Sequence, residues 1–208
     1  MNYLLHSHRY GLSLMENEAE FQCLWGEITS TLDNISDNDI IDYYNRYCAN
    51  SMSISKAINN IIKERLIQLG WNAESPIFQE GEYSSKRWRL DFAKETVSIE
   101  VAFNHGEAIA WNLLKPVLAS ELNHVEKAIQ TKAGIVIAAT ENMKVSGGFD
   151  NACGEYEKVL RYLTPLNNIL TVPMVIIGLE APTTFKVRKE KINGRNIGII
   201  ERLDNHEI

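Results

Sequence analysis

The chain has little sulfur chemistry to offer. Its 208 residues include three cysteines, which lie far apart and form no Cys-x-x-Cys pair: Cys23, Cys48 and Cys153. An odd number of scattered cysteines excludes a disulfide framework and gives no zinc-binding spacing. We interpret the three as buried thiols in a reducing compartment.

Long hydrophobic runs are also missing. No apolar stretch approaches the roughly 18 residues that a membrane-spanning helix needs. The first residues, MNYLLHSHRYGLSL, lack a basic segment followed by an apolar one, which is the pattern of a secretion signal. We therefore expect a cytoplasmic protein that does not interact with membranes.

The third shortage is positive charge. Lysine and arginine number 21 against 27 aspartate and glutamate residues, so the net charge is −6. This balance argues against a uniformly basic surface for nucleic acid. The cations are clustered, however. Lys86, Arg87 and Arg89 stand together without an anion, and Lys186 to Arg195 contains five cations and one anion. An acidic protein with a basic groove is therefore possible.

The segment Lys86 to Asn104, KRWRLDFAKETVSIEVAFN, is the most informative stretch. Its alternating, β-branched residues predict two strands, 87–93 and 97–103, joined by a tight turn. Glu100 stands in the middle of the second, apolar strand, where an unpaired carboxylate is energetically unfavourable. With Asp91 nine positions earlier, it suggests a site for Mg²⁺, a hard cation that prefers oxygen ligands.

The remaining pattern predicts helices on both sides of a mixed sheet, antiparallel at the hairpin and parallel afterwards, which is an α/β fold. A turn at Asn193-Gly194 predicts a hairpin near the end of the chain. We expect a single domain, 1–208, with a helical part at 16–70, a core at 71–180 and a basic tail at 183–208. The predicted elements are helices at 16–32, 37–47, 55–69, 107–130 (kinked or broken at Pro116) and 156–163, strands at 71–78, 134–140 and 170–179, a strand or turn at 3–14, and a loop at 141–151.

Together these segments resemble the PD-(D/E)xK nuclease superfamily, and within it the BglII/BstYI-like type II restriction endonucleases. The resemblance covers about residues 55–180. It depends on the order and spacing of IIKERLIQLGW, RLDFAKETVSIEVAFN, GEYEKVL and VPMVIIGL. It implies a restriction-endonuclease-like core with a mixed central β-sheet flanked by helices.

The resemblance also implies roles for particular residues. Asp91 and Glu100 would bind Mg²⁺ together with the backbone carbonyl of Val101. The loop from Ser146 to Asn151 would lie at the DNA major groove, where polar side chains read base edges. The DNA-binding residues expected on this basis, with the basic group beside the hairpin, are Lys86, Arg87, Arg89, Ser146, Gly147, Asp150 and Asn151.

Two positions depart from the superfamily pattern. Leu90 replaces the proline of the name. Ala102 stands where the superfamily has lysine and the BglII/BstYI-like enzymes have glutamine or glutamate, and a methyl group cannot orient water or stabilise an oxyanion. Another residue must then supply the third catalytic group. The candidates are Glu64, Lys115, Glu121 and His105.

The resemblance implies a homodimeric, Mg²⁺-dependent enzyme that hydrolyses double-stranded DNA at a short palindrome with a GATC centre. Three alternatives remain open from the sequence. The chain could be a nuclease of the same superfamily outside restriction, or a catalytically inactive DNA-binding module. It could also be an α/β domain whose carboxylates only form ion pairs.

Overall fold

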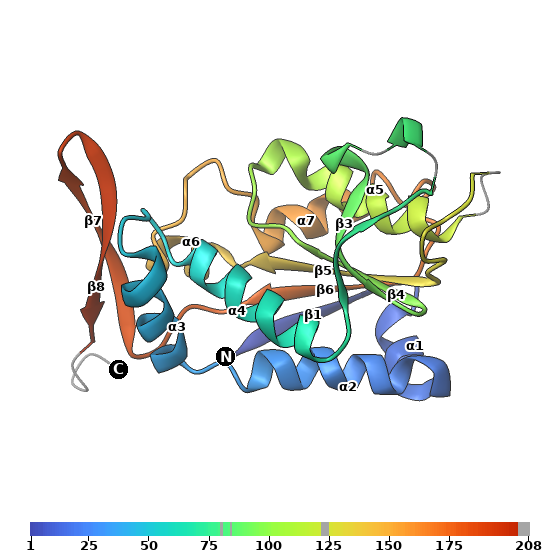
Figure 1. Ribbon diagram of the computed structural model, residues 1–208, viewed down its shortest axis with the longest axis horizontal. Helices are drawn as coiled ribbons and strands as arrows, with labels where there is room; N and C mark the ends of the chain where they lie inside the picture. The colour runs from blue at the N-terminus through green and yellow to red at the C-terminus, as the bar shows by residue number, and fades with distance from the viewer. Residues whose placement is uncertain (80, 84, 122–124, 204–208) are drawn as a thin grey trace.

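A six-stranded mixed sheet forms the centre of the molecule (Figure 1). The computed structural model describes residues 1–79, 81–83, 85–121 and 125–203. Strands β4, β5 and β6 run parallel, whereas β1, β2 and β3 pair antiparallel with their neighbours. This confirms the predicted arrangement of an antiparallel hairpin followed by parallel strands. In spatial order the strands are β1 (Tyr3–His8), β6 (Met174–Leu179), β5 (Ala133–Ala139), β4 (Val97–Val101), β3 (Arg89–Lys94) and β2 (Asn72–Pro76).

Helices cover both faces of this sheet. Figure 1 shows α2 and α4 along one side and α5 and α7 along the other. The first layer packs Phe21, Ile28 and Ile58 against Ile99 and Ile135 of the sheet. The second face has its own apolar cluster around α5 and α7. The helices are α1 (Gly11–Asn17), α2 (Ala19–Asp33), α3 (Asp37–Tyr43), α4 (Ser55–Gln68), α5 (Ile109–Ser120), α6 (Glu141–Ser146) and α7 (Tyr156–Leu163), with short turns at Tyr44–Cys48, Gly81–Tyr83, Lys86–Trp88 and Gly106–Ala108.

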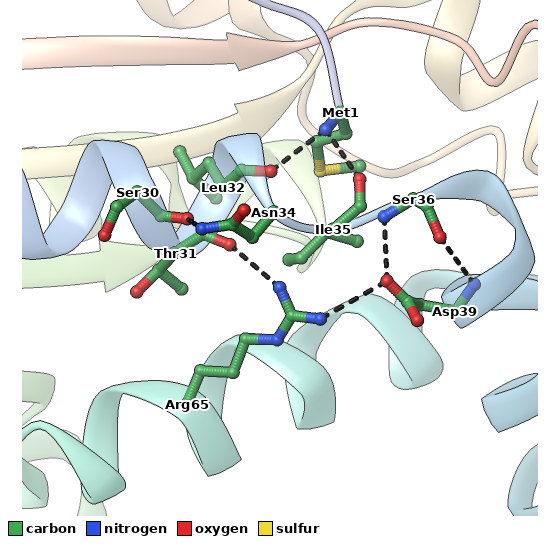
Figure 2. Close-up of polar contacts among 9 residues, drawn as sticks. All are labelled: Met1, Ser30, Thr31, Leu32, Asn34, Ile35, Ser36, Asp39 and Arg65. Atoms are coloured by element: carbon green, nitrogen blue, oxygen red, sulfur yellow. Dashed lines mark hydrogen bonds and ion pairs between the residues drawn. The ribbon is translucent and has the colours of Figure 1, made fainter.

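Polar contacts join the ends of the first-layer helices (Figure 2). Ser36 and Asp39 form a reciprocal capping box at the start of α3, as the N-terminal serine signal predicts. Arg65 of α4 donates to the carbonyl of Thr31 and to Asp39, both at 3.3 Å. The amine of Met1 donates to the carbonyls at the end of α2, including that of Ile35 at 2.6 Å. These bonds join α2, α3 and α4 into the helix layer that packs against β4.

The basic tail folds into a hairpin of β7 (Phe185–Ile192) and β8 (Arg195–Arg202), which forms a separate two-stranded sheet at one end of the molecule (Figure 1). Its turn residues Asn193 and Gly194 have φ values of 50° and 79°, as a type I′ turn requires. Asp37 accepts hydrogen bonds from the backbone N–H groups of Thr183 and Thr184 just before β7. The predicted hairpin is confirmed, and residues 204–208 of the predicted tail lie outside the described residues.

Three predicted elements need correction. The helix predicted at 107–130 ends at Ser120, and Pro116 lies inside α5 without dividing it into two helices. Residues 125–130 are not helical, and 122–124 lie outside the described residues. The predicted helix at 16–32 begins within α1, which ends at Asn17, and continues as the separate α2. The predicted loop at 141–151 starts with α6. Within the described ranges, none of the helices combines the length and apolar character that a membrane span needs.

Candidate active site

The β3–β4 hairpin sets the two predicted carboxylates side by side. Phe92 pairs with Ile99 in the antiparallel register, and the next pair in that register is Asp91 with Glu100. Directly opposed residues of an antiparallel pair project to the same face of the sheet. The alternation along β4 directs Ile99 and Val101 toward α2 and α4, and so directs Glu100 toward α5.

Lys115 meets Glu100 on that face. It comes from α5, and its ammonium nitrogen lies 2.5 Å from Oε2 of Glu100. The Lys115 side chain is 11% exposed and that of Glu100 2% exposed, so the pair is screened from water and its charges interact strongly. Ala102, next along the same face, packs with Ile109 and Leu113 of α5. The helix that buries Ala102 therefore also supplies a lysine to Glu100.

The two carboxylates are both harder to ionise than usual. Burial raises the pKa of Glu100 well above its ordinary value, and the nearby charge of Asp91 raises it further, while Lys115 acts in the opposite direction. Burial also raises the pKa of Asp91, against the lowering effect of the Val101 N–H and of Lys115. Two close carboxyl groups with raised pKa values have an unmet demand for positive charge.

The carboxylate oxygens of Asp91 and Glu100 suit a hard metal ion. One carboxylate oxygen of Asp91, Oδ2, accepts the N–H of Val101 at 2.7 Å. Oε1 of Glu100 is buried and has no hydrogen-bond partner in the described chain. Among the described residues, no His, Cys, Asp or Glu completes a three-ligand cluster with this pair. A magnesium ion needs only one or two carboxylates because it keeps several waters, so the donor set fits Mg²⁺.

A family model described as "Restriction endonuclease BglII/BglIII" matches residues 3–179. The chain belongs to this family. Its members are site-specific deoxyribonucleases, and the predicted restriction-endonuclease resemblance is therefore confirmed. No curated protein sequence matches the chain.

Two solved structures of BglII are similar to this family member. One is BglII in complex with a DNA 16-mer, with 19% identity and a TM-score of 0.67. The other is free BglII, with 17% identity and a TM-score of 0.57. Each comparison covers 98% of this chain and 100% of the BglII chain. At such low identity the likeness establishes the fold.

In this BglII-family chain, Lys115 is the candidate third group that contacts Glu100 of the carboxylate pair. The exposed side chain of Glu64 points from α4 toward α3, where it accepts the hydroxyl of Tyr43 at 2.6 Å. Glu121 follows the end of α5 and accepts the hydroxyl of Thr171. His105 is exposed in the turn after β4, where its backbone pairs with Cys153. The structure therefore does not bring these three to Glu100.

The predicted basic group lies at the same edge as the carboxylates. Because β3 runs antiparallel to β4, the start of β3 lies beside the end of β4. Lys86 and Arg87 are exposed in the short turn before β3, and Arg89 is half-buried as its first residue. Nε of Arg89 is buried without a hydrogen-bond partner in the described chain.

The predicted recognition loop also adjoins this edge. Ser146 is the last residue of α6 and Gly147 its C-cap, and Asp150 and Asn151 are exposed. Backbone bonds join this loop to the segment after β4: Gly106 donates to Ala152 at 2.7 Å and Gly154 donates to Asn104 at 2.9 Å. Candidate base-reading side chains and candidate metal ligands are thus held in one framework.

One neighbouring acidic residue was not anticipated from the sequence. Glu74 lies in β2 opposite Asp91, where the pairing skips from Ala73 to Ser75. Its φ of 52° is left-handed, and its carboxylate is 3.8 Å from Lys63 of α4. Its negative charge raises the pKa of Asp91, while the positive charge of Lys63 lowers it. Only the acidic residue type could have signalled it, because a left-handed glutamate within a strand has no sequence signature.

Proposed function

We propose that the chain is a type II restriction endonuclease that hydrolyses phosphodiester bonds of double-stranded DNA with Mg²⁺ at Asp91, Glu100 and the carbonyl of Val101. Glu100 carries this proposal. It is buried, its pKa is raised, and one oxygen is paired with Lys115 while the other has no partner. A buried, half-satisfied carboxylate destabilises a fold, and a second cation at Oε1 would remove that defect.

The protein's own groups have distinct tasks in this scheme. The N–H of Val101 holds Oδ2 of Asp91, which leaves Oδ1 as the oxygen that would bind the metal. Lys115 favours the ionised form of Glu100 against the effect of its burial, and its ammonium group can donate hydrogen bonds to the phosphate or to the attacking water. When bound, Mg²⁺ supplies Lewis-acid stabilisation of charge at the phosphate and lowers the pKa of water.

The residues around the carboxylate pair support DNA as the binding partner. The similar BglII structure contains a DNA 16-mer, and the basic group and the polar loop lie at the edge where β4 ends. We further propose a palindromic site with a GATC centre, read by the loop from Ser146 to Asn151. A palindrome has two-fold symmetry, so a homodimer with one active site per strand matches it.

The outer face of α5 supports a homodimer. Trp111, Leu114 and Leu118 recur at helical spacing and are all half-exposed. Each also packs in part against the chain's own apolar residues, and the exposed remainder of this stripe suits a protein interface. A second copy of this chain is the proposed occupant, because α5 also carries Lys115, and pairing two α5 helices would fix the distance between two active sites.

Asp91→Ala tests the proposal. We expect Mg²⁺-dependent cleavage of plasmid DNA to fall at least about a hundredfold, while binding of duplex DNA in Ca²⁺ stays within a few-fold of wild type. Asp42→Ala, an exposed aspartate on α3, is the matched control and should cleave normally. Full cleavage by Asp91→Ala would remove the central claim.

Sequencing the ends of the wild-type products separates the alternatives. Discrete ends at one palindrome support restriction, whereas random ends support a superfamily nuclease outside restriction. The second candidate, an inactive DNA-binding module, is favoured by Ala102. DNA binding with neither cleavage nor calorimetric uptake of Mg²⁺ would establish that alternative.

A further inference from the structure

A hollow of about 300 Å³ lies beside the end of β4, on the opposite side of the strand from Lys115. The start of α4 forms one wall, and the chain leaving β4 forms the other. Its lining residues are Ser55, Lys56, Asn59, Val101, Phe103 and Asn104. The hollow therefore includes the residue whose carbonyl is a proposed metal ligand.

The side chains around this hollow favour an anion. Lys56 is exposed, and no acidic side chain of the described residues lies within ion-pairing distance of it. Asn59 is exposed one helical turn later and offers amide N–H donors. The first turn of α4 has no acidic residue, and no carboxylate lines the hollow. A cation and an amide without a competing carboxylate match a phosphate group.

The other contacts leave these two groups available. Ser55 is bonded to Ser53 at 2.8 Å, and Asn104 accepts the amide of Asn112 at 2.9 Å. Ser55 lies on the α4 wall and Asn104 on the wall formed by the chain leaving β4. Lys63, two turns after Lys56 on α4, is already engaged with Glu74. Lys56 and Asn59 are thus the residues of the α4 wall whose side-chain hydrogen-bond donors remain available.

We propose that this hollow binds a backbone phosphate of duplex DNA adjacent to the cleaved one, through Lys56 and Asn59. The inference rests on the proposed function, since it takes Val101 to mark the cleaved phosphate. Val101 connects the two positions, so a strand lying across the end of β4 meets the metal ligands on one side and Lys56 on the other. A contact of this kind positions the DNA without reading its sequence.

The salt dependence of DNA binding tests this site. In buffer with a metal chelator, affinity for a mixed-sequence duplex is measured across a range of salt concentrations. Each phosphate contact by a lysine contributes about −0.9 to the slope of log K against log salt. We expect Lys56→Gln to reduce the steepness by about that amount, and Asn59→Asp to weaken binding about tenfold by adding an anion. Thermal melting verifies that both variants fold.

Lys132→Gln is the matched control, because Lys132 lies just before β5, at the opposite end of the sheet, and pairs with Glu20. Its slope should equal that of wild type. Wild-type slopes and affinities for both Lys56→Gln and Asn59→Asp, alongside wild-type cleavage in Mg²⁺, would overturn the phosphate site and leave the proposed function standing. If the wild type binds DNA without cleaving it, the proposed function fails. The salt slopes of the two variants would still show whether this hollow binds a phosphate. Absence of duplex binding by the wild type would remove both.

Discussion

At the scale of single residues, Lys115 reaches Glu100 from a helix rather than from the strand position held by Ala102. The strand could not have supplied it, since Ala102 is buried against Ile109 and Leu113. A lysine there would have to displace this packing. From the sequence, Lys115 was one of four candidates. Choosing among them required knowing that α5 crosses the sheet beside Glu100.

Lys115→Met should lower the rate of Mg²⁺-dependent cleavage about a hundredfold and leave DNA binding in Ca²⁺ unchanged. Because Lys115 lowers the pKa of Glu100, its loss should also shift the remaining activity toward higher pH. Lys94→Met is the control for loss of an ion-paired, half-buried lysine, since Lys94 pairs with Glu27 at the far end of β3. Wild-type rates and pH profile for Lys115→Met would contradict this role.

Asp91 is expected to cost stability in the absence of metal. Its pKa is raised on folding, so the folded state binds more protons than the unfolded state between the unfolded pKa near 4 and the higher folded value. Metal-free stability therefore rises as pH falls through that window. Asn at this position keeps an acceptor for Val101 N–H and carries no charge.

We predict that Asp91→Asn raises the metal-free free energy of unfolding at pH 7 by about 1 kcal/mol and flattens its dependence on pH. Urea unfolding in chelator from pH 4 to pH 8 measures both effects. Mg²⁺ should stabilise the wild type and not this variant. A less stable Asp91→Asn protein at pH 7 would show that the site carries no such electrostatic strain.

At the scale of elements, the hydrophobic pattern correctly predicted the helices and strands whose form is set by local residue order. The buried run of β5, the hairpin of β3 and β4, and the apolar stripes of α4 and α7 all follow from local residue order. The capping serine of α3 and the Asn193-Gly194 turn were equally local signals. The β3–β4 hairpin holds Asp91 and Glu100, which is why the core of the site could be predicted.

Elements set by distant contacts were harder. The Pro116 ring packs so closely on Gly134 that a Cβ added there would lie 2.5 Å from it, and this packing retains proline within α5 despite the lost hydrogen bond. Helix α6 buries only Met143 and so has no stripe. Its cap, Thr140 accepting the N–H of Met143, was the available signal. The left-handed backbone of Glu74 had none.

At the scale of the whole molecule, the homodimer proposal depends on the apolar stripe of α5. We predict that Leu114→Glu produces a monomer in light scattering and lowers double-strand cleavage, with nicked plasmid as the main product. Leu114 is half-exposed in the single chain, so the charge would lose its remaining contact with water only in the dimer, where it has no partner. Val145→Glu, an exposed apolar residue on α6, serves as the control. A dimeric Leu114→Glu protein would place the interface elsewhere.

The pairing of β1 with β6 has a consequence for how the enzyme is made. This pairing joins residues 3–8 to residues 174–179, so the sheet is completed only after residue 179 has been synthesised. Closing so long a loop is slow, and non-local pairing delays folding. A nascent chain can form the β3–β4 hairpin early but lacks the finished sheet behind it. The framework around Asp91 and Glu100 therefore becomes complete only once β6 has been synthesised and has paired with β1.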